Sequence, residues 1–331
     1  MSAAALVALM RDPARAGGLE ARAWNGILSA ARAERLLGTL AVLLADVAVP
    51  DSVRAILADA RLDAEREQRI ARWEANRAAE ALGPLGLEPI LLKGAAYAVA
   101  GLEAARGRMI GDLDILVPRD RLEEAEAALL AAGWEWVKPD PYDDAYYRQW
   151  MHELPPLIHR ERDRMIDVHH TILPLTARPR PDAAALIAQS VDVGSGLRVL
   201  SPVDRVLHAV AHMLADGDLS GGLRNLWDIR CLFAEVEDIS ELERRAAHHG
   251  LTAHLARARR LADHVYGPGG IGLTLVDRLF LRRLLSRDEW GRDSNKWLGL
   301  TFYIRSHLLR MPPLMLMRHL FTKWRKGHRP V

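Results

Sequence analysis

Short apolar runs, several of them alternating with polar residues and bounded by glycine or proline, occupy the middle of the chain. The strands that this pattern predicts are Pro89–Leu92, Asp112–Val117, Trp134–Val137, Leu157–Arg160 and Met165–His170. Between the second and third lies a predicted helix over Arg119–Ala132, which ends at Gly133. Strands that alternate with a helix indicate a unit containing both α-helices and a β-sheet.

On both sides of this central part, apolar residues recur mainly at the spacing of an α-helix. Residues 1–82 are rich in Ala, Leu and Arg, and a long helix is expected to start at Asp51 or Ser52 and to run to Ala81. From Ser201 onward the chain is helical again, with Ser201 as an N-cap and proline in the first turn. The pattern predicts an α+β fold, with an N-terminal helical region (1–82), a core (83–200) and a C-terminal helical domain (201–331).

Composition narrows the class of protein. Half of the 331 residues are hydrophobic, and 45 basic against 43 acidic residues give a net charge of +2. This balance offers no strong electrostatic argument for nucleic acid as an obligatory partner. Cys231 is the only cysteine, so no internal disulfide can form, and it is expected to be a small buried hydrophobic residue in a reducing compartment. Without a long apolar stretch or a signal-like N-terminus, a cytoplasmic location is the default expectation.

Asp112 and Asp114 lie at alternate positions of an apolar run, so both carboxylates share one face of the predicted strand. Two carboxylates this close repel each other unless a cation lies between them. Mg²⁺ is typically held by one or two carboxylates together with substrate phosphates, and the pair therefore predicts a metal-phosphate site. Taken alone, such a short pattern is more often a solvated strand edge.

Two neighbouring segments strengthen the metal-phosphate interpretation. Leu87–Gly94 is a predicted strand that ends in glycine and is followed by a helix-like run from Ala95. A glycine at such a turn lets the backbone approach a phosphate, and the helix N-terminus supplies free N–H groups beside the charge of Lys93. Downstream, Asp167 shares a strand face with His169 and offers a third carboxylate.

Taken in order, these segments resemble the polymerase-β-like nucleotidyltransferase superfamily, and within it a poorly characterised bacterial branch. The resemblance rests on Leu92-Lys-Gly, Asp112-Leu-Asp-Ile-Leu-Val, His152-Glu-Leu-Pro-Pro and Ile166-Asp-Val-His-His. It covers roughly residues 84–171 and continues more weakly through 200–233. It implies a small mixed-sheet core that uses Mg²⁺ or Mn²⁺ and a nucleoside triphosphate.

The resemblance also implies roles for individual residues. Gly94 would contact the triphosphate, Asp112 and Asp114 would bind two Mg²⁺ ions, and Asp167 would complete the site. The superfamily usually has Gly-Ser or Gly-Gly at the turn, whereas Gly94 is followed by Ala95. Without the serine hydroxyl, triphosphate binding would depend on backbone amides and on the preceding lysine.

Other residues are predicted to support this site. Lys93 and Arg108 would neutralise the departing pyrophosphate, and His169 would support the carboxylate of Asp167. The segment from Pro139, with His152 beyond it, is expected to form a loop that borders the site.

Aromatic residues in that segment have two interpretations. Tyr146, Tyr147 or Trp150 could stack on a base, although such residues more often lie buried or anchor a loop.

A further polar cluster occurs in the C-terminal region. His208 and His212 stand four residues apart on a predicted helix over Asp204–Ala215, which is the spacing of a two-histidine metal site. No H-E-x-x-H glutamate accompanies them and their neighbours are apolar, which favours a packed or substrate-facing role over zinc. By resemblance His212, Arg224 and Asp228 line the cleft, and an interhelical salt bridge with helix caps explains the last two equally well.

The C-terminal tail from Met311 mixes apolar and basic residues. Such a tail suits a membrane surface, but basic residues are also common at helix C-termini because cations interact favourably with the helix dipole. The second explanation is preferred.

The reaction expected from these residues is Mg²⁺-dependent transfer of a nucleoside monophosphate from a triphosphate to a hydroxyl-bearing acceptor, with release of pyrophosphate. The acceptor could be a small molecule, a peptide or a protein. Two alternatives stay open: a metal-dependent phosphohydrolase, and a degenerate module that binds a nucleotide without catalysis.

Overall fold

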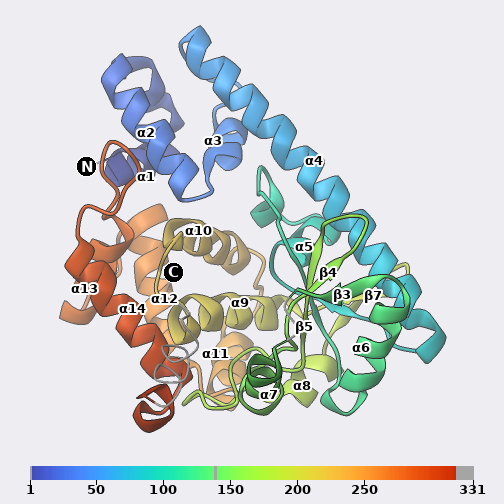
Figure 1. Ribbon diagram of the computed structural model, residues 1–331. Coiled ribbons are helices and arrows are strands. Elements are labelled where there is room, and N and C mark those ends of the chain that lie inside the picture. Colours follow the sequence, from blue (N-terminus) through green and yellow to red (C-terminus); the bar gives the residue numbers. More distant parts are fainter. Residues whose placement is uncertain (1, 138–139, 318–331) are drawn as a thin grey trace.

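The molecule combines one mixed β-sheet with helices that surround it. The computed structural model describes residues 2–137 and 140–317 (Figure 1). In this view the sheet lies on the right, the long helix α4 runs along the upper edge and the C-terminal helices lie on the left. The α+β fold predicted from the sequence is confirmed.

Seven strands form the sheet in the part of the chain that the structure describes. Their order is β3-β4-β5-β2-β1-β7-β6, with β2–β5 and β1–β7 parallel and the other neighbours antiparallel. The strands are β1 (Ile90–Leu91), β2 (Leu113–Leu116), β3 (Trp134–Trp136), β4 (Leu157–His159), β5 (Met165–His169), β6 (Val191–Gly194) and β7 (Leu197–Val199). The five strands expected from the sequence are therefore confirmed, each one or two residues shorter than predicted.

The helices form the rest of the fold. They are α1 (Ser2–Arg11), α2 (Ala21–Ala33), α3 (Leu37–Leu43), α4 (Asp51–Leu82), α5 (Lys93–Val99), α6 (Leu122–Ala131), α7 (Pro141–Trp150), α8 (Ala183–Ala188), α9 (Pro202–Ala211), α10 (Gly222–Phe233), α11 (Ile239–His248), α12 (Thr252–Tyr266), α13 (Leu275–Leu284) and α14 (Lys296–Arg310). Ser201 caps α9 as expected, since its hydroxyl accepts the amide of Asp204 at 3.3 Å. The predicted helix over 204–215 ends its regular part at Ala211 and continues as a π-helical turn, η5 (His212–Asp216).

Two local expectations were wrong or incomplete. The segment after Pro139 is a helix, α7, rather than a loop, because Asp140 caps it by accepting the amides of Tyr142 and Asp143 and Pro141 occupies its first turn. The hairpin β6–β7 was not predicted. Its strands, Val-Asp-Val-Gly and Leu-Arg-Val, do alternate apolar with polar residues, but each is only three or four residues long and they are separated by a glycine-containing turn, so the alternation is too short to stand out.

The parallel pairing of β2 with β5 decides where the acidic residues meet. In the register of these strands Asp114 lies directly opposite Asp167. Directly opposite residues of neighbouring strands present their side chains on the same face of the sheet. The fold thus brings two carboxylates together that are separated by more than fifty residues of sequence.

Helix α4 connects the N-terminal helices to the sheet. It packs on α3, α5, α6, β2 and β7. Glu67 and Glu74 pair with Arg164 and Arg162, respectively, which lie in the connection between β4 and β5. Arg162 also stacks over the ring of Trp134, with 4.7 Å from the guanidinium carbon to the ring centroid. The helix holds the β4–β5 hairpin, and through it the strand that carries Asp167. The division of the chain at residues 82 and 200 stays a prediction.

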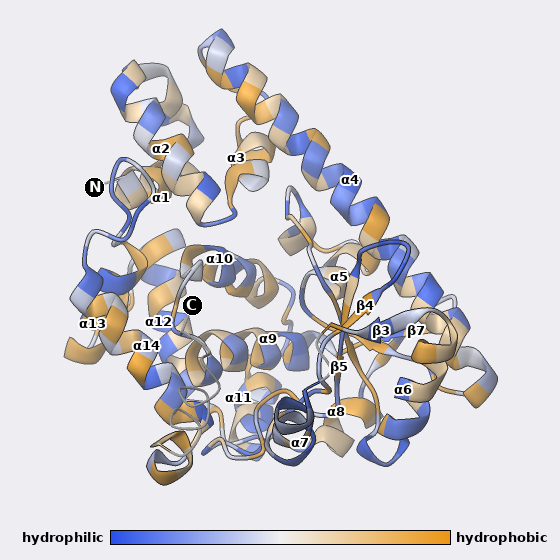
Figure 2. Cartoon of the chain, in the orientation of Figure 1, coloured by the Kyte–Doolittle hydropathy of each residue, from blue (hydrophilic) through white to orange (hydrophobic). Residues whose placement is uncertain are grey.

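Apolar side chains form a continuous core through the sheet and the helices. The strands that meet at the centre of the sheet are hydrophobic, whereas α4 is hydrophilic along much of its length (Figure 2). Cys231 is buried as expected. None of the described helices is long and apolar enough to cross a membrane. Most of the basic tail predicted from the sequence lies outside the described residues.

Candidate active site

Three carboxylates gather at the start of β2 and on the neighbouring strand β5. Ligand atoms of Asp112, Asp114 and Asp167 all lie within 4.8 Å of one another. Asp112 precedes the strand and is exposed, Asp114 is buried and Asp167 is half-buried. Among the described residues, the carboxylates of Asp112 and Asp167 have no hydrogen-bond or ion-pair partner, so the expected support of Asp167 by His169 is wrong: His169 contacts Asp114 and Glu153 instead. The structure therefore brings together the acidic residues that the sequence analysis singled out.

Asp114 is held by two side chains that donate to the same oxygen. Lys93 Nζ lies 2.5 Å and His169 Nε2 3.0 Å from Asp114 Oδ1. No donor among the described residues contacts Oδ2. Burial alone would raise the pKa of Asp114, but Lys93 and His169 outweigh burial and hold it well below its usual range. Asp114 is thus an ionised carboxylate with one oxygen still free.

Burial has the opposite outcome at Asp167. Desolvation, together with the nearby carboxylates of Asp114 and Glu153, raises the pKa of Asp167 to about 7. The two facing carboxylates therefore differ in pKa because Lys93 and His169 stabilise the charge of Asp114, whereas burial and neighbouring acids disfavour that of Asp167.

Lys93 and Gly94 begin α5 at the end of β1. Lys93 has φ of 47°, in the left-handed region that residues other than glycine rarely adopt. At Gly94, an added Cβ would lie 2.8 Å from Arg108 Nε and 3.1 Å from Ile110 Cγ1. Glycine is needed here to make room for the arginine side chain. The predicted contact of Gly94 with a triphosphate stays a prediction.

Arg108 is paired rather than free. Its guanidinium lies over the ring of Tyr97, 5.6 Å from the centroid, and donates to Asp228 on α10. Arg224 donates to the other oxygen of Asp228 and, at 2.6 Å, to the hydroxyl of Thr39. Arg224 and Asp228 therefore form a buried salt bridge, but within α10 rather than between helices as expected, and it reaches the site through Arg108.

A small cavity lies between α5, α9 and α10. Its volume is about 30 Å³, enough for one or two water molecules. The residues around it include Lys93, Arg108, His208, His212 and Asp228. His212 and Asp228 thus border the same cavity as Lys93, whereas Arg224 lies behind it. Burial, followed by the charge of Lys93, lowers the pKa of His212 to about 3 and that of His208 well below 6.5, so both imidazoles are neutral.

Glu153 was missed by the sequence analysis. It follows His152 and forms a single β-bridge with His169, which places Glu153 Oε2 3.4 Å from His169 Nδ1 and 3.6 Å from His152 Nε2. Burial raises the pKa of Glu153. Only its position beside His152 in the sequence could have indicated it, since an isolated bridge leaves no strand pattern.

Helix α7 brings aromatic side chains to the edge of the site. The pKa of Tyr147 is raised to about 12 by burial and by the carboxylates of Glu153 and Asp167. Trp150 is 41% exposed. Tyr147 therefore lies close to the acidic residues, and stacking of a base on the aromatic residues of α7 stays a prediction.

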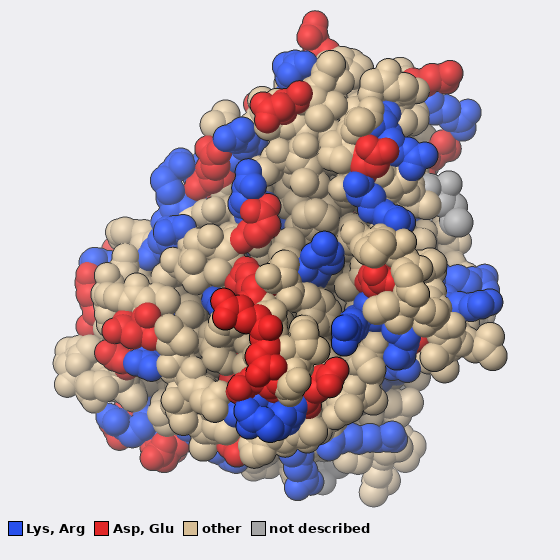
Figure 3. Space-filling view, turned by 180° about the vertical axis from the view of Figure 1, so that it is seen from behind, with Lys and Arg blue, Asp and Glu red and all other residues tan. Residues whose placement is uncertain are grey.

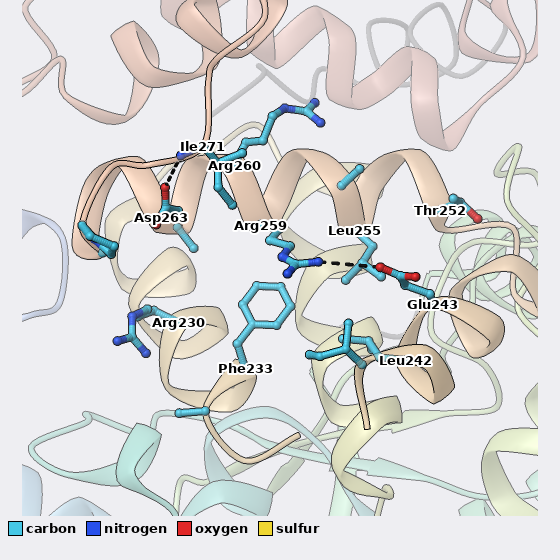
Figure 4. Close-up of a pocket in the computed structure, with 16 residues that line it drawn as sticks. Arg230, Phe233, Leu242, Glu243, Thr252, Leu255, Arg259, Arg260, Asp263 and Ile271 are labelled. Atoms are coloured by element: carbon cyan, nitrogen blue, oxygen red, sulfur yellow. Dashed lines mark hydrogen bonds and ion pairs between the residues drawn. The ribbon is translucent and has the colours of Figure 1, made fainter. Parts of the chain in front are cut away.

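A cavity much larger than the one beside Lys93 lies elsewhere. It has a volume of about 760 Å³ and is lined mainly by α10, α11 and α12 (Figure 4). Phe233, Leu242 and Leu255 form an apolar surface, and Arg259 pairs with Glu243 across it at 3.6 Å. None of the acidic-site residues borders this cavity, so size alone does not identify the site.

The sequence model of a family described as uncharacterised nucleotidyltransferases matches residues 20–267. The chain belongs to this family. The match includes the whole sheet, the acidic residues and helices α4, α9 and α10, so the family extends beyond the core that the motifs delimit. Comparisons with curated proteins and with solved structures gave no match. At a coarse level, membership implies that the protein is a transferase with a nucleotide substrate.

Charged residues of both signs are distributed over the surface. On the face shown in Figure 3, basic and acidic side chains are interspersed, with a band of acidic side chains near the centre and no continuous basic surface. This agrees with the nearly balanced net charge of +2.

Proposed function

We propose that this protein is a Mg²⁺-dependent nucleotidyltransferase that moves a nucleoside monophosphate from a nucleoside triphosphate to a hydroxyl of an acceptor and releases pyrophosphate. The observation that carries the proposal is the cluster of Asp112, Asp114 and Asp167, whose ligand atoms lie within 4.8 Å of one another. The acceptor is a small molecule, a peptide or a protein.

The residues present fit a hard divalent cation. All three donors are carboxylates, which Mg²⁺ and Mn²⁺ prefer, and the free Oδ2 of Asp114 leaves one oxygen of that residue for a cation. When bound, Mg²⁺ would neutralise charge on the phosphates and align the reacting oxygens. The charges around the site also support this assignment, because the single positive charge of Lys93 cannot compensate three carboxylates.

The chain's own residues have distinct tasks in this proposal. Asp112 and Asp114 hold the cation against the triphosphate. Asp167, on the neighbouring strand, orients the acceptor hydroxyl or takes its proton. Lys93 keeps Asp114 ionised, and with Arg108 it adds positive charge on the side where pyrophosphate departs.

A transfer assay tests the proposal directly. Purified protein is incubated with Mg²⁺ or Mn²⁺, each triphosphate labelled on the α-phosphate, and a lysate of the host, and the fractions are searched for label. We expect label in an acceptor and loss of transfer in the Asp112→Asn variant. Release of labelled nucleotide without any labelled acceptor would instead identify a phosphohydrolase. Binding of a triphosphate with neither outcome would identify a non-catalytic module.

A further inference from the structure

A second group of metal-ligating side chains lies beside the acidic site. It consists of His152, Glu153 and His169, with ligand atoms within 4.8 Å of one another. Glu153 Oε2 lies 3.4 Å from His169 Nδ1 and 3.6 Å from His152 Nε2. Ligands that bind one Zn²⁺ tetrahedrally at its usual bond lengths are about 3.3 Å apart. Two of the three separations are therefore close to the spacing that such an ion requires.

Hydrogen bonding does not account for this arrangement. His169 is 1% exposed, and its Nδ1, which faces Glu153, has no hydrogen-bond partner among the described residues. Burying a polar atom without a partner costs free energy. A cation between Nδ1 and the carboxylate would give this nitrogen the partner that it lacks.

The other nitrogen of His169 already has the contact that metal-bound histidines make. A ligating imidazole commonly donates its second N–H to a carboxylate, which sets the tautomer and the ring orientation. His169 Nε2 lies 3.0 Å from Asp114 Oδ1. A cation on Nδ1 requires the proton on Nε2, where it is donated to Asp114.

We propose that His152, Glu153 and His169 bind a divalent transition-metal ion of the Zn²⁺ type, separate from the Mg²⁺ site of the three aspartates. Two imidazoles and one carboxylate suit Zn²⁺ and similar ions, whereas Mg²⁺ prefers oxygen ligands throughout. The ion fastens the segment after α7 to β5 and fixes the proton that His169 donates to Asp114. The site goes beyond the proposed function and does not depend on it.

Cobalt serves as the probe, because Co²⁺ bound by nitrogen in a four- or five-coordinate site absorbs visible light far more strongly than Co²⁺ in a six-coordinate oxygen site. The full chain is titrated with Co²⁺ in excess Mg²⁺, which occupies the aspartate site. We expect one Co²⁺ with intense absorption per chain. Glu153→Gln should weaken binding by more than about 10-fold, while Asp112→Asn and the exposed-histidine control His248→Gln should not.

Two measurements keep the outcome decisive. Circular dichroism checks that Glu153→Gln is folded, and pulsed EPR of the Cu²⁺-loaded native protein detects coordinated imidazole without any substitution. Imidazole signals together with retained Co²⁺ binding in Asp112→Asn support the site. Absence of intense absorption, or binding that Asp112→Asn abolishes and Glu153→Gln leaves intact, overturns it. Neither result bears on nucleotidyl transfer, which is measured separately.

Discussion

The two aspartates of the D-x-D pattern differ more than their spacing suggests. Asp112 is exposed and has no partner among the described residues, whereas Asp114 is buried between Lys93 and His169. From the sequence both were expected to have the same role, as ligands of Mg²⁺. At Asp114, removal of the carboxylate also takes the partner from a lysine that is only 24% exposed.

Substitution of the two aspartates by asparagine should therefore separate function from stability. Asp112→Asn should lower transfer by at least about 100-fold, as expected for loss of a metal ligand, without lowering the free energy of unfolding. Asp114→Asn should also lower the free energy of unfolding by about 2–3 kcal/mol, because Lys93 keeps a charge without its carboxylate. Urea unfolding at neutral pH measures the difference. Equal stability of the two variants would show that the Lys93–Asp114 pair contributes nothing.

At the scale of elements, the sheet is tied to the C-terminal helices by a buried ion network. Arg108 comes from the loop before β2, Asp228 and Arg224 from α10, and Thr39 from α3. Helix α10 thereby contacts both the loop that carries Arg108 and an N-terminal helix. The position of Arg108 over Gly94 depends on a helix far away in the sequence.

The network predicts a large effect for Asp228→Asn. Two guanidinium groups would lose the carboxylate that they share, so the free energy of unfolding should fall by about 3 kcal/mol. Glu103→Gln is the matched control, because Glu103 pairs with Arg106 at the exposed surface and should cost less than about 1 kcal/mol. Denaturant unfolding compares them, and equal effects would mean that burial does not strengthen the network.

At the scale of the whole molecule, several histidines are buried in neutral form. His152 and His208 have pKa values well below 6.5, mainly because of desolvation. The unfolded chain binds protons on these residues below pH 6.5, whereas the folded chain does not. The contribution of these histidines to the free energy of unfolding therefore favours folding above pH 6.5 and is lost progressively as the pH falls below that value.

A comparison with His208→Gln isolates one of these contributions. Asp167, with its raised pKa, changes stability in the opposite sense, but it is present in both proteins and cancels in the difference. The variant should be less stable than the native protein near neutral pH, and this deficit should shrink by about 1.4 kcal/mol per pH unit below pH 6.5. Urea titrations between about pH 7.5 and pH 5 measure it. A deficit that does not vary with pH would show that the imidazole is protonated in the folded state.

Local patterns in the sequence were sufficient for the central strands and for α4 and α9. Each depends on residues close together in the chain, where side-chain periodicity and capping act directly. The same reasoning failed at α7, where a capping aspartate and a first-turn proline outweighed the polar, loop-like composition, and at the β6–β7 hairpin, whose two alternating runs are only three or four residues long.

Only the tertiary structure decided which side chains meet. The parallel register of β2 with β5 sets Asp114 opposite Asp167, an isolated bridge brings Glu153 to His169, and α10 supplies the carboxylate that holds Arg108. These contacts join residues far apart in the chain, so they depend on strand order and helix packing rather than on local pattern. By itself the sequence determined which acids lie close together along the chain; the fold determined that Lys93 and His169 would bind one oxygen of Asp114 and leave the other free.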